Sequence, residues 1–131
     1  EIYTLSLHDA LPISIVGKFD GLSVRVPTPV VSLSDVTALL RRDVTVEQVN
    51  GAFKKAAQSN FYQGILGVSE EPLVSRDFIG NSCSGIVDLP LTKVVDGNLI
   101  KVMVWYDNEW GYSNRLVELV ADVGHYLRRS E

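Results

Sequence analysis

The sequence has 131 residues, with 12 lysines and arginines against 16 aspartates and glutamates, for a formal net charge of −4. This length suits a single domain, and 46% hydrophobic with 21% charged residues argues against wholesale disorder. The negative charge excludes a basic footprint for nucleic acid or an anionic membrane, and no charge-free apolar run approaches the roughly 20 residues of a membrane-spanning helix. We therefore expect a soluble, intracellular domain with no nucleic-acid or membrane partner.

The first 14 residues, EIYTLSLHDALPIS, do not fit the rest of the sequence. They begin with Glu1 and carry Asp9 within the apolar run, so they lack the positive start and long apolar core of a signal peptide. They are similar to translated sequencing-adapter sequence, which predicts that 1–14 are foreign and that the domain occupies 15–131. The alternative is a native N-terminal strand or helix. If the stretch is foreign, His8 has no functional role.

The sequence that follows begins with strand patterns. Residues 22–26 alternate apolar and polar side chains, which is typical of a strand with its apolar residues on one face and Arg25 on the other. Residues 30–40 come after two prolines and are rich in β-branched side chains, so we predict a second strand. Ser34 could instead cap a helix in this segment.

A helix is predicted in the middle of the chain. Thr45 and Gln48 have the spacing of a capping box, and apolar residues then recur at helical intervals, which predicts a helix over 46–59. Residues 64–68 read as a short buried strand, and 74–78 are a further strand candidate before a loop.

The last third of the sequence predicts a hairpin and a long helix. An Asp96-Gly97 pair separates the apolar runs 86–95 and 98–106, and this pair suits a tight turn in which both central residues have positive φ. The second run carries few charges, so we predict a central strand covered on both faces. A helix should follow over about 109–128. Its apolar stripe consists of Leu116, Leu119, Val120, Val123 and Leu127.

These elements do not alternate as βαβ units. The predicted fold class is therefore α+β: a mostly antiparallel or mixed sheet with a mid-chain helix and a long C-terminal helix. No glycine-rich phosphate-binding pattern occurs, so the sequence supplies no dinucleotide-binding fold of its own.

The sequence contains few cysteines and histidines, and no pattern pairs them with other catalytic or metal-binding residues. Cys83 lies in a polar loop and His125 near the end of a helix, so we assign structural roles to both. Together with His8 they cannot make a four-ligand metal site, and no metal is predicted.

Two stretches carry a more specific pattern: GLSVRVPTP at 21–29 and WYDNEWGYSNR at 105–115. In this order and at this separation they closely resemble the C-terminal, catalytic-domain part of phosphorylating glyceraldehyde-3-phosphate dehydrogenase. The resemblance covers nearly all of 17–128. It implies that 15–131 are the C-terminal part of that catalytic domain, without the Rossmann half, and that the final helix packs on the nucleotide-binding half.

The resemblance implies an NAD- or NADP-dependent oxidoreductase of glycolysis and gluconeogenesis. Enzymes of this family oxidise a phosphorylated aldehyde and join it to inorganic phosphate as an acyl phosphate, in a cytoplasmic homotetramer. The family's catalytic cysteine lies in a Ser-Cys-Thr-Thr-Asn motif that does not occur here, and Cys83 does not match it. The histidine base also belongs to a segment upstream of the matched one. No catalytic residue is therefore assigned, and the chain alone is expected to be inactive.

Three residues inherit binding roles from the resemblance. Arg25 matches an arginine that binds a substrate-site phosphate, for which a permanently charged, bidentate guanidinium is suited; the alternative is a surface ion pair. Asn108 matches the asparagine that hydrogen-bonds the nicotinamide carboxamide, with a helix N-cap as the alternative. Tyr112 matches a tyrosine near the nicotinamide ring, and aromatic packing would explain it almost as well.

Two other functions remain open at this point. The chain could be a stand-alone, non-catalytic binding or scaffold module of the same fold. It could also belong to the related erythrose-4-phosphate dehydrogenase.

Overall fold

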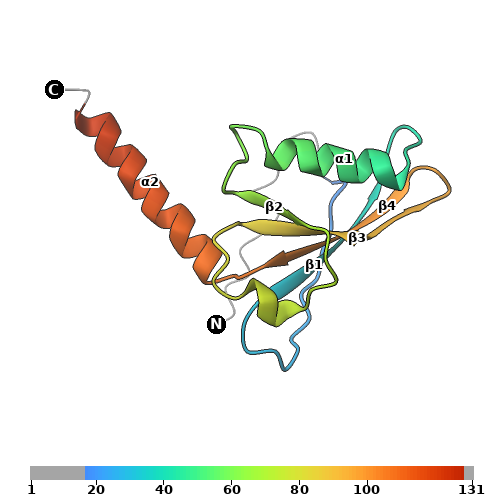
Figure 1. Ribbon diagram of the computed structural model, residues 1–131, viewed down its shortest axis with the longest axis horizontal. Coiled ribbons are helices and arrows are strands. Elements are labelled where there is room, and N and C mark those ends of the chain that lie inside the picture. Colours follow the sequence, from blue (N-terminus) through green and yellow to red (C-terminus); the bar gives the residue numbers. More distant parts are fainter. Residues whose placement is uncertain (1–16, 129–131) are drawn as a thin grey trace.

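The computed structural model describes residues 17–128, which form one four-stranded sheet, two α-helices and a 3-10 helix (Figure 1). In chain order the elements are β1 (Ser32–Leu39), α1 (Val46–Ala57), β2 (Leu66–Ser69), η3 (Ser75–Phe78), β3 (Gly85–Val95), β4 (Leu99–Tyr106) and α2 (Trp110–Arg128). The predicted foreign stretch 1–14, with His8, lies outside the described residues. Within the described range, neither helix has the length and apolar character of a membrane span.

The sheet is mixed, with strand order β1-β4-β3-β2. β4 pairs antiparallel with both β1 and β3, whereas β2 runs parallel to β3. The predicted α+β class and the central position of β4 are therefore confirmed. The predicted hairpin is confirmed as well, because Asp96 and Gly97 join β3 to β4 with φ values of 49° and 77°.

The predicted capping box starts α1. The Thr45 hydroxyl accepts a hydrogen bond from the Gln48 backbone N–H at 3.3 Å, and the Gln48 side chain accepts one from the Thr45 N–H at 2.9 Å. The helix ends at Ala57, two residues before the predicted end. It lies on one face of the sheet (Figure 1), where Val49 packs with Val87, Leu89 and Val102 in the main core.

A smaller core lies on the opposite face of the sheet. It consists of Val31, Phe78 and Ile86, with Trp105 of β4 packed against it. The rings of Phe78 and Trp105 stack with centroids 5.5 Å apart, and the Trp105 indole N–H donates to Asp88 at 2.9 Å. This arrangement ties η3 and the loop after it to β4.

Two strand predictions are wrong. Residues 22–26 form no strand, and the apolar side chains of the predicted face are exposed, Leu22 at 87%. Alternation stabilises a strand only where a neighbouring strand pairs with it, and no described strand does so here. Residues 74–78 contain the 3-10 helix η3 instead, because the Asp77 carboxylate accepts the Val74 N–H at 2.8 Å and closes a turn.

The expectation that β4 is covered on both faces is also wrong. Val102 is its one buried residue, and the others are half-buried or exposed. The helix α1 covers β2 and β3 more than it covers β1 and β4, and the small core on the other face reaches only the end of β4 near Trp105.

The predicted C-terminal helix is confirmed as α2, which projects away from the sheet at the end of β4 (Figure 1). Only Gly111 in its first turn is buried. Every residue of its predicted apolar stripe is exposed, from 48% at Leu116 to 67% at Val120. The stripe therefore has no packing partner within 17–128.

The difference between core and unpacked valines can be measured directly. Val102→Ala removes two methyl groups from the main core and should lower the free energy of unfolding by about 2 kcal/mol. Val117→Ala, at a site that is 69% exposed on α2, is the matched control and should change it by less than about 0.5 kcal/mol. Urea unfolding of the purified chain provides the measurement, and equal effects at both sites would contradict the described core.

Candidate functional site

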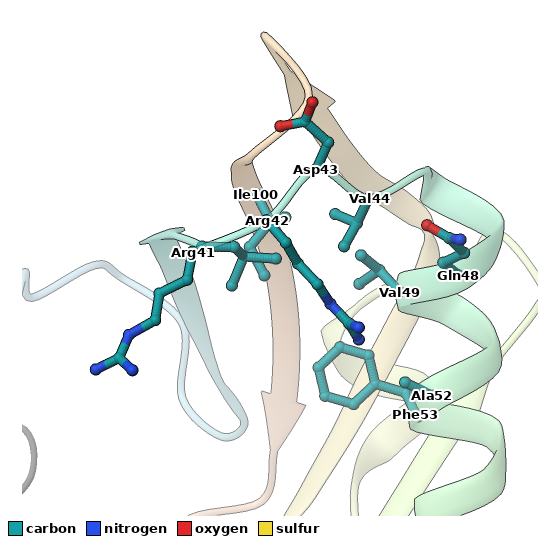
Figure 2. Close-up of a pocket in the computed structure, with 10 residues that line it drawn as sticks. Arg41, Arg42, Asp43, Val44, Gln48, Val49, Ala52, Phe53 and Ile100 are labelled. Carbon is teal, nitrogen blue, oxygen red and sulfur yellow. The ribbon is translucent and has the colours of Figure 1, made fainter.

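A cavity of about 570 Å³ lies between α1 and the loop after β1 (Figure 2). Core side chains such as Val49, Phe53 and Ile100 line it together with charged residues of the loop after β1. The Arg42 side chain extends toward Phe53, whereas Arg41 points away from the cavity (Figure 2). Because none of the predicted binding residues lines it, this cavity is not the candidate site.

A second cavity, of about 260 Å³, lies where β4 passes into α2. Two of the three predicted binding residues, Asn108 and Tyr112, line it together. Arg25 is not among its lining residues. The full lining consists of Ser84, Tyr106, Asp107, Asn108, Gly111, Tyr112 and Arg115.

A buried carboxylate, Asp107, organises this cavity. One of its oxygens accepts the backbone N–H groups of Glu109 at 3.2 Å and Trp110 at 2.9 Å, which caps the start of α2. The other accepts the Gly80 N–H at 2.9 Å, from the loop after η3. Asp107 therefore joins the helix start to a segment 27 residues away in the sequence.

The same hydrogen bonds determine the charge state of this group. The Gly80 N–H, followed by the Trp110 N–H, holds the pKa of the Asp107 carboxyl below its usual range; burial acts in the opposite direction, and the Glu109 N–H lowers the pKa further. Asp107 is consequently a carboxylate at neutral pH.

The cap formed by Asp107 rules out one of the two interpretations of Asn108. Asp107, and not Asn108, is the N-cap of α2, so the alternative role for Asn108 is wrong. Asn108 is exposed, and its carboxamide makes no hydrogen bond to any residue of 17–128. Within the described range its donor and acceptor groups are therefore unpaired, and the residue lines the cavity.

Two further contacts hold the first turns of α2 against the segments that precede β2 and β3. The Arg115 guanidinium donates to the Gly64 carbonyl at 3.0 Å and pairs with Glu118 at 2.6 Å. Gly111 lies so close to the loop before β3 that an added Cβ would be 2.9 Å from the Cys83 carbonyl oxygen. Only glycine fits there, and these contacts set the direction in which α2 leaves the sheet.

The geometry gives Cys83 no catalytic character. Burial raises the pKa of the Cys83 thiol, and the positive charge of Arg115 offsets this only in part. A nucleophilic cysteine needs the opposite shift. Among residues 17–128 no group of three or more His, Cys, Asp or Glu side chains is placed to hold a metal ion.

Arg25 lies in the segment before β1, which has no regular secondary structure, and the residue is exposed. Its predicted place on the polar face of a strand is wrong, since 22–26 form no strand. The alternative interpretation, a surface ion pair, finds no support either, because no acidic residue in the described range pairs with Arg25.

Comparison with known proteins gives the class of the chain. A family model described as "Glyceraldehyde 3-phosphate dehydrogenase, C-terminal domain" matches residues 7–108. Glyceraldehyde-3-phosphate dehydrogenase of Zymomonas mobilis subsp. mobilis is 50% identical over 111 residues, which cover 85% of this chain and 33% of that protein. The protein of the same name from Geobacillus stearothermophilus is 53% identical over 105 residues, covering 80% and 31%. Glyceraldehyde-3-phosphate dehydrogenase 1 of Bacillus subtilis is 54% identical with the same coverage.

The family-model match, together with the α+β fold, identifies the chain as the C-terminal domain of a dehydrogenase. The chain belongs to the glyceraldehyde-3-phosphate dehydrogenase family, which confirms the resemblance seen in the sequence. It spans about a third of the length of the curated relatives it matches.

Sequence reasoning missed the roles of two residues at this site. Asp107 stands three residues before Trp110, which is N-cap spacing, so its cap could have been inferred from the sequence. Its bond to Gly80 and the contact of Arg115 with Gly64 link segments 27 and 51 residues apart, and no local pattern indicates them.

Acid titration of stability tests the hydrogen bonds of Asp107. Its folded pKa is lowered, so its stabilisation is complete above the ordinary aspartate pKa of about 3.9 and is lost as the pH falls through the folded value. Asp107→Asn should be less stable than the parent at pH 7 and should show a shallower loss of stability from about pH 5 to pH 2.

Urea midpoints measured across this pH range provide the comparison. Asp122→Asn, on the exposed part of α2, is the control and should follow the parent curve. Parallel curves for Asp107→Asn and the parent would show that the carboxylate is not held as described.

Proposed function

We propose that the chain is the C-terminal part of a phosphorylating glyceraldehyde-3-phosphate dehydrogenase acting in cytoplasmic glycolysis and gluconeogenesis. The reaction converts an aldehyde phosphate, inorganic phosphate and NAD⁺ or NADP⁺ into an acyl phosphate, the reduced cofactor and a proton. In this proposal the catalytic cysteine, the histidine base and most of the cofactor site belong to the rest of a longer protein. The observation that carries the proposal is that the Asn108 carboxamide has no hydrogen-bond partner within 17–128 and lines the same cavity as Tyr112.

The chemistry of Asn108 fits a nicotinamide. A primary amide ligand has one carbonyl acceptor and one N–H₂ donor, and the Asn108 side chain offers the complementary pair. When bound, the cofactor supplies the hydride acceptor of the reaction. Asn108 would fix the rotation of the carboxamide group and, through it, the face of the ring presented to the substrate. Tyr112 lies one helical turn further on, at the same cavity, and would contact the ring.

Arg25 is proposed to bind a phosphate group in the substrate site. Its guanidinium is exposed and has no ion pair in the described range, so binding a phosphate would break no internal contact. Two parallel N–H···O bonds to phosphate are charge-assisted and directional. They would orient the substrate while the thiol of the longer protein attacks the aldehyde carbon.

The exposed apolar stripe of α2 favours the interpretation that this chain is part of a larger protein over the interpretation that it is a stand-alone module. Five large apolar side chains spaced along one side of a helix rarely remain in water in a functional protein. We propose that this stripe packs on the nucleotide-binding half and that the complete enzyme is a homotetramer.

A chimera tests these roles. In it, the part of this chain that matches the Geobacillus stearothermophilus dehydrogenase over 105 residues, at 53% identity, replaces the corresponding part of that enzyme. The chimera should form NADH in a reaction that requires both aldehyde phosphate and inorganic phosphate. Arg25→Gln removes a charge-assisted contact and should raise the KM for a phosphate-bearing reactant roughly tenfold to a hundredfold, while Arg41→Gln should leave it unchanged.

The chain without the rest of the enzyme is the second control and should form no NADH. Unchanged KM values in a folded, active Arg25→Gln chimera would contradict the role of Arg25. Cys83-dependent NADH formation by the chain alone would contradict the assignment of the catalytic cysteine to another segment.

A further inference from the structure

Asn108 lies in the short connection between β4 and α2. The residue before it, Asp107, makes hydrogen bonds to the residues after it. The Asp107 side chain accepts the N–H groups of Glu109 and Trp110, and the Asp107 carbonyl accepts the Gly111 N–H at 2.9 Å. Asp107, on one side of Asn108, therefore makes three hydrogen bonds to the residues on the other side. The backbone of Asn108 has little freedom to rotate.

The second oxygen of Asp107 fixes this connection relative to the sheet. It binds the N–H of Gly80, whose φ of 77° is a conformation that glycine adopts without strain. Two residues earlier, Phe78 stacks on Trp105, which lies two residues before Asp107 on β4. The ring stack therefore attaches the loop around Gly80 to β4, and the hydrogen bond from Gly80 attaches Asp107 to this loop.

We propose that Asp107 is the positioning residue of the nicotinamide site: its carboxylate fixes the Asn108 backbone and leaves the Asn108 carboxamide free for the cofactor. The inference rests on the proposed function of Asn108. It assigns to Asp107 no contact with the cofactor, because Asp107 is buried and both its oxygens bind backbone N–H groups of the chain itself.

The geometry also explains why an aspartate suits this position. A serine or threonine hydroxyl at the same place could cap α2, but it lacks the second oxygen with which Asp107 binds Gly80. An asparagine would present one oxygen and one N–H₂ group, and the latter would face a backbone N–H donor. A carboxylate alone accepts on both sides, and the bonds are stronger for its charge.

Cofactor affinity in the chimera tests this role. NAD is compared with 3-acetylpyridine adenine dinucleotide, in which a methyl ketone replaces the carboxamide and removes its N–H₂ donor. Asn108→Ala and Asp107→Asn should each weaken NAD binding about tenfold, and the double variant should be no weaker than Asn108→Ala alone. For the analogue, the effect of Asp107→Asn should fall to about threefold or less.

Two controls separate positioning from a loss of stability. Val102→Ala destabilises the core without touching the cap and should leave the ratio of the two cofactor affinities unchanged. Asp107→Ser keeps a capping oxygen and loses the Gly80 bond. It should show the same preferential loss of NAD affinity, and it replaces Asp107→Asn if that variant does not assemble.

The outcomes distinguish the two proposals. If Asn108→Ala binds NAD as tightly as the parent, the proposed role of Asn108 is wrong. If Asn108→Ala weakens NAD binding but the effects of the two single variants multiply in the double variant, Asp107 does not act through Asn108 and the inference is overturned.

Discussion

The structure around the candidate site depends on one buried charge. Asp107 is 4% exposed, and a buried ion without partners would cost several kcal/mol. Three backbone N–H groups, from Gly80, Glu109 and Trp110, compensate for this cost. Because the donors come from both the helix start and a distant loop, the charge is stable only when both segments are in place. The position of Asn108 follows from that requirement.

The rest of the fold is well packed in one region and open in others. The core between α1 and the sheet buries Val49, Val87 and Val102, whereas the apolar stripe of α2 and the side chains of 22–26 are exposed. A chain that spans about a third of its relatives' length has fewer segments with which to cover such surfaces. The apolar stripe of α2 is the surface on which we propose that the nucleotide-binding half of the longer protein packs.

The sequence predicted the elements whose cause is local. The capping box of Thr45 and Gln48 and the Asp96-Gly97 turn act within a few residues, and both are present. The strand predicted at 22–26 is absent, because alternation needs a pairing strand that the pattern does not contain. For the site, the motif placed Asn108 and Tyr112, which the structure brings to one cavity, but the bond from Gly80 to Asp107 depends on tertiary structure.

Amide hydrogen exchange of the folded chain tests the central claim most directly. The Gly80 and Trp110 N–H groups share one acceptor residue, so in Asp107→Ala both should exchange faster by a similar factor, while the Val49 N–H, bonded within α1, keeps its parent rate. Faster exchange at Trp110 with no change at Gly80 would show that Asp107 only caps the helix. The account of a carboxylate that holds helix and loop together would then be contradicted.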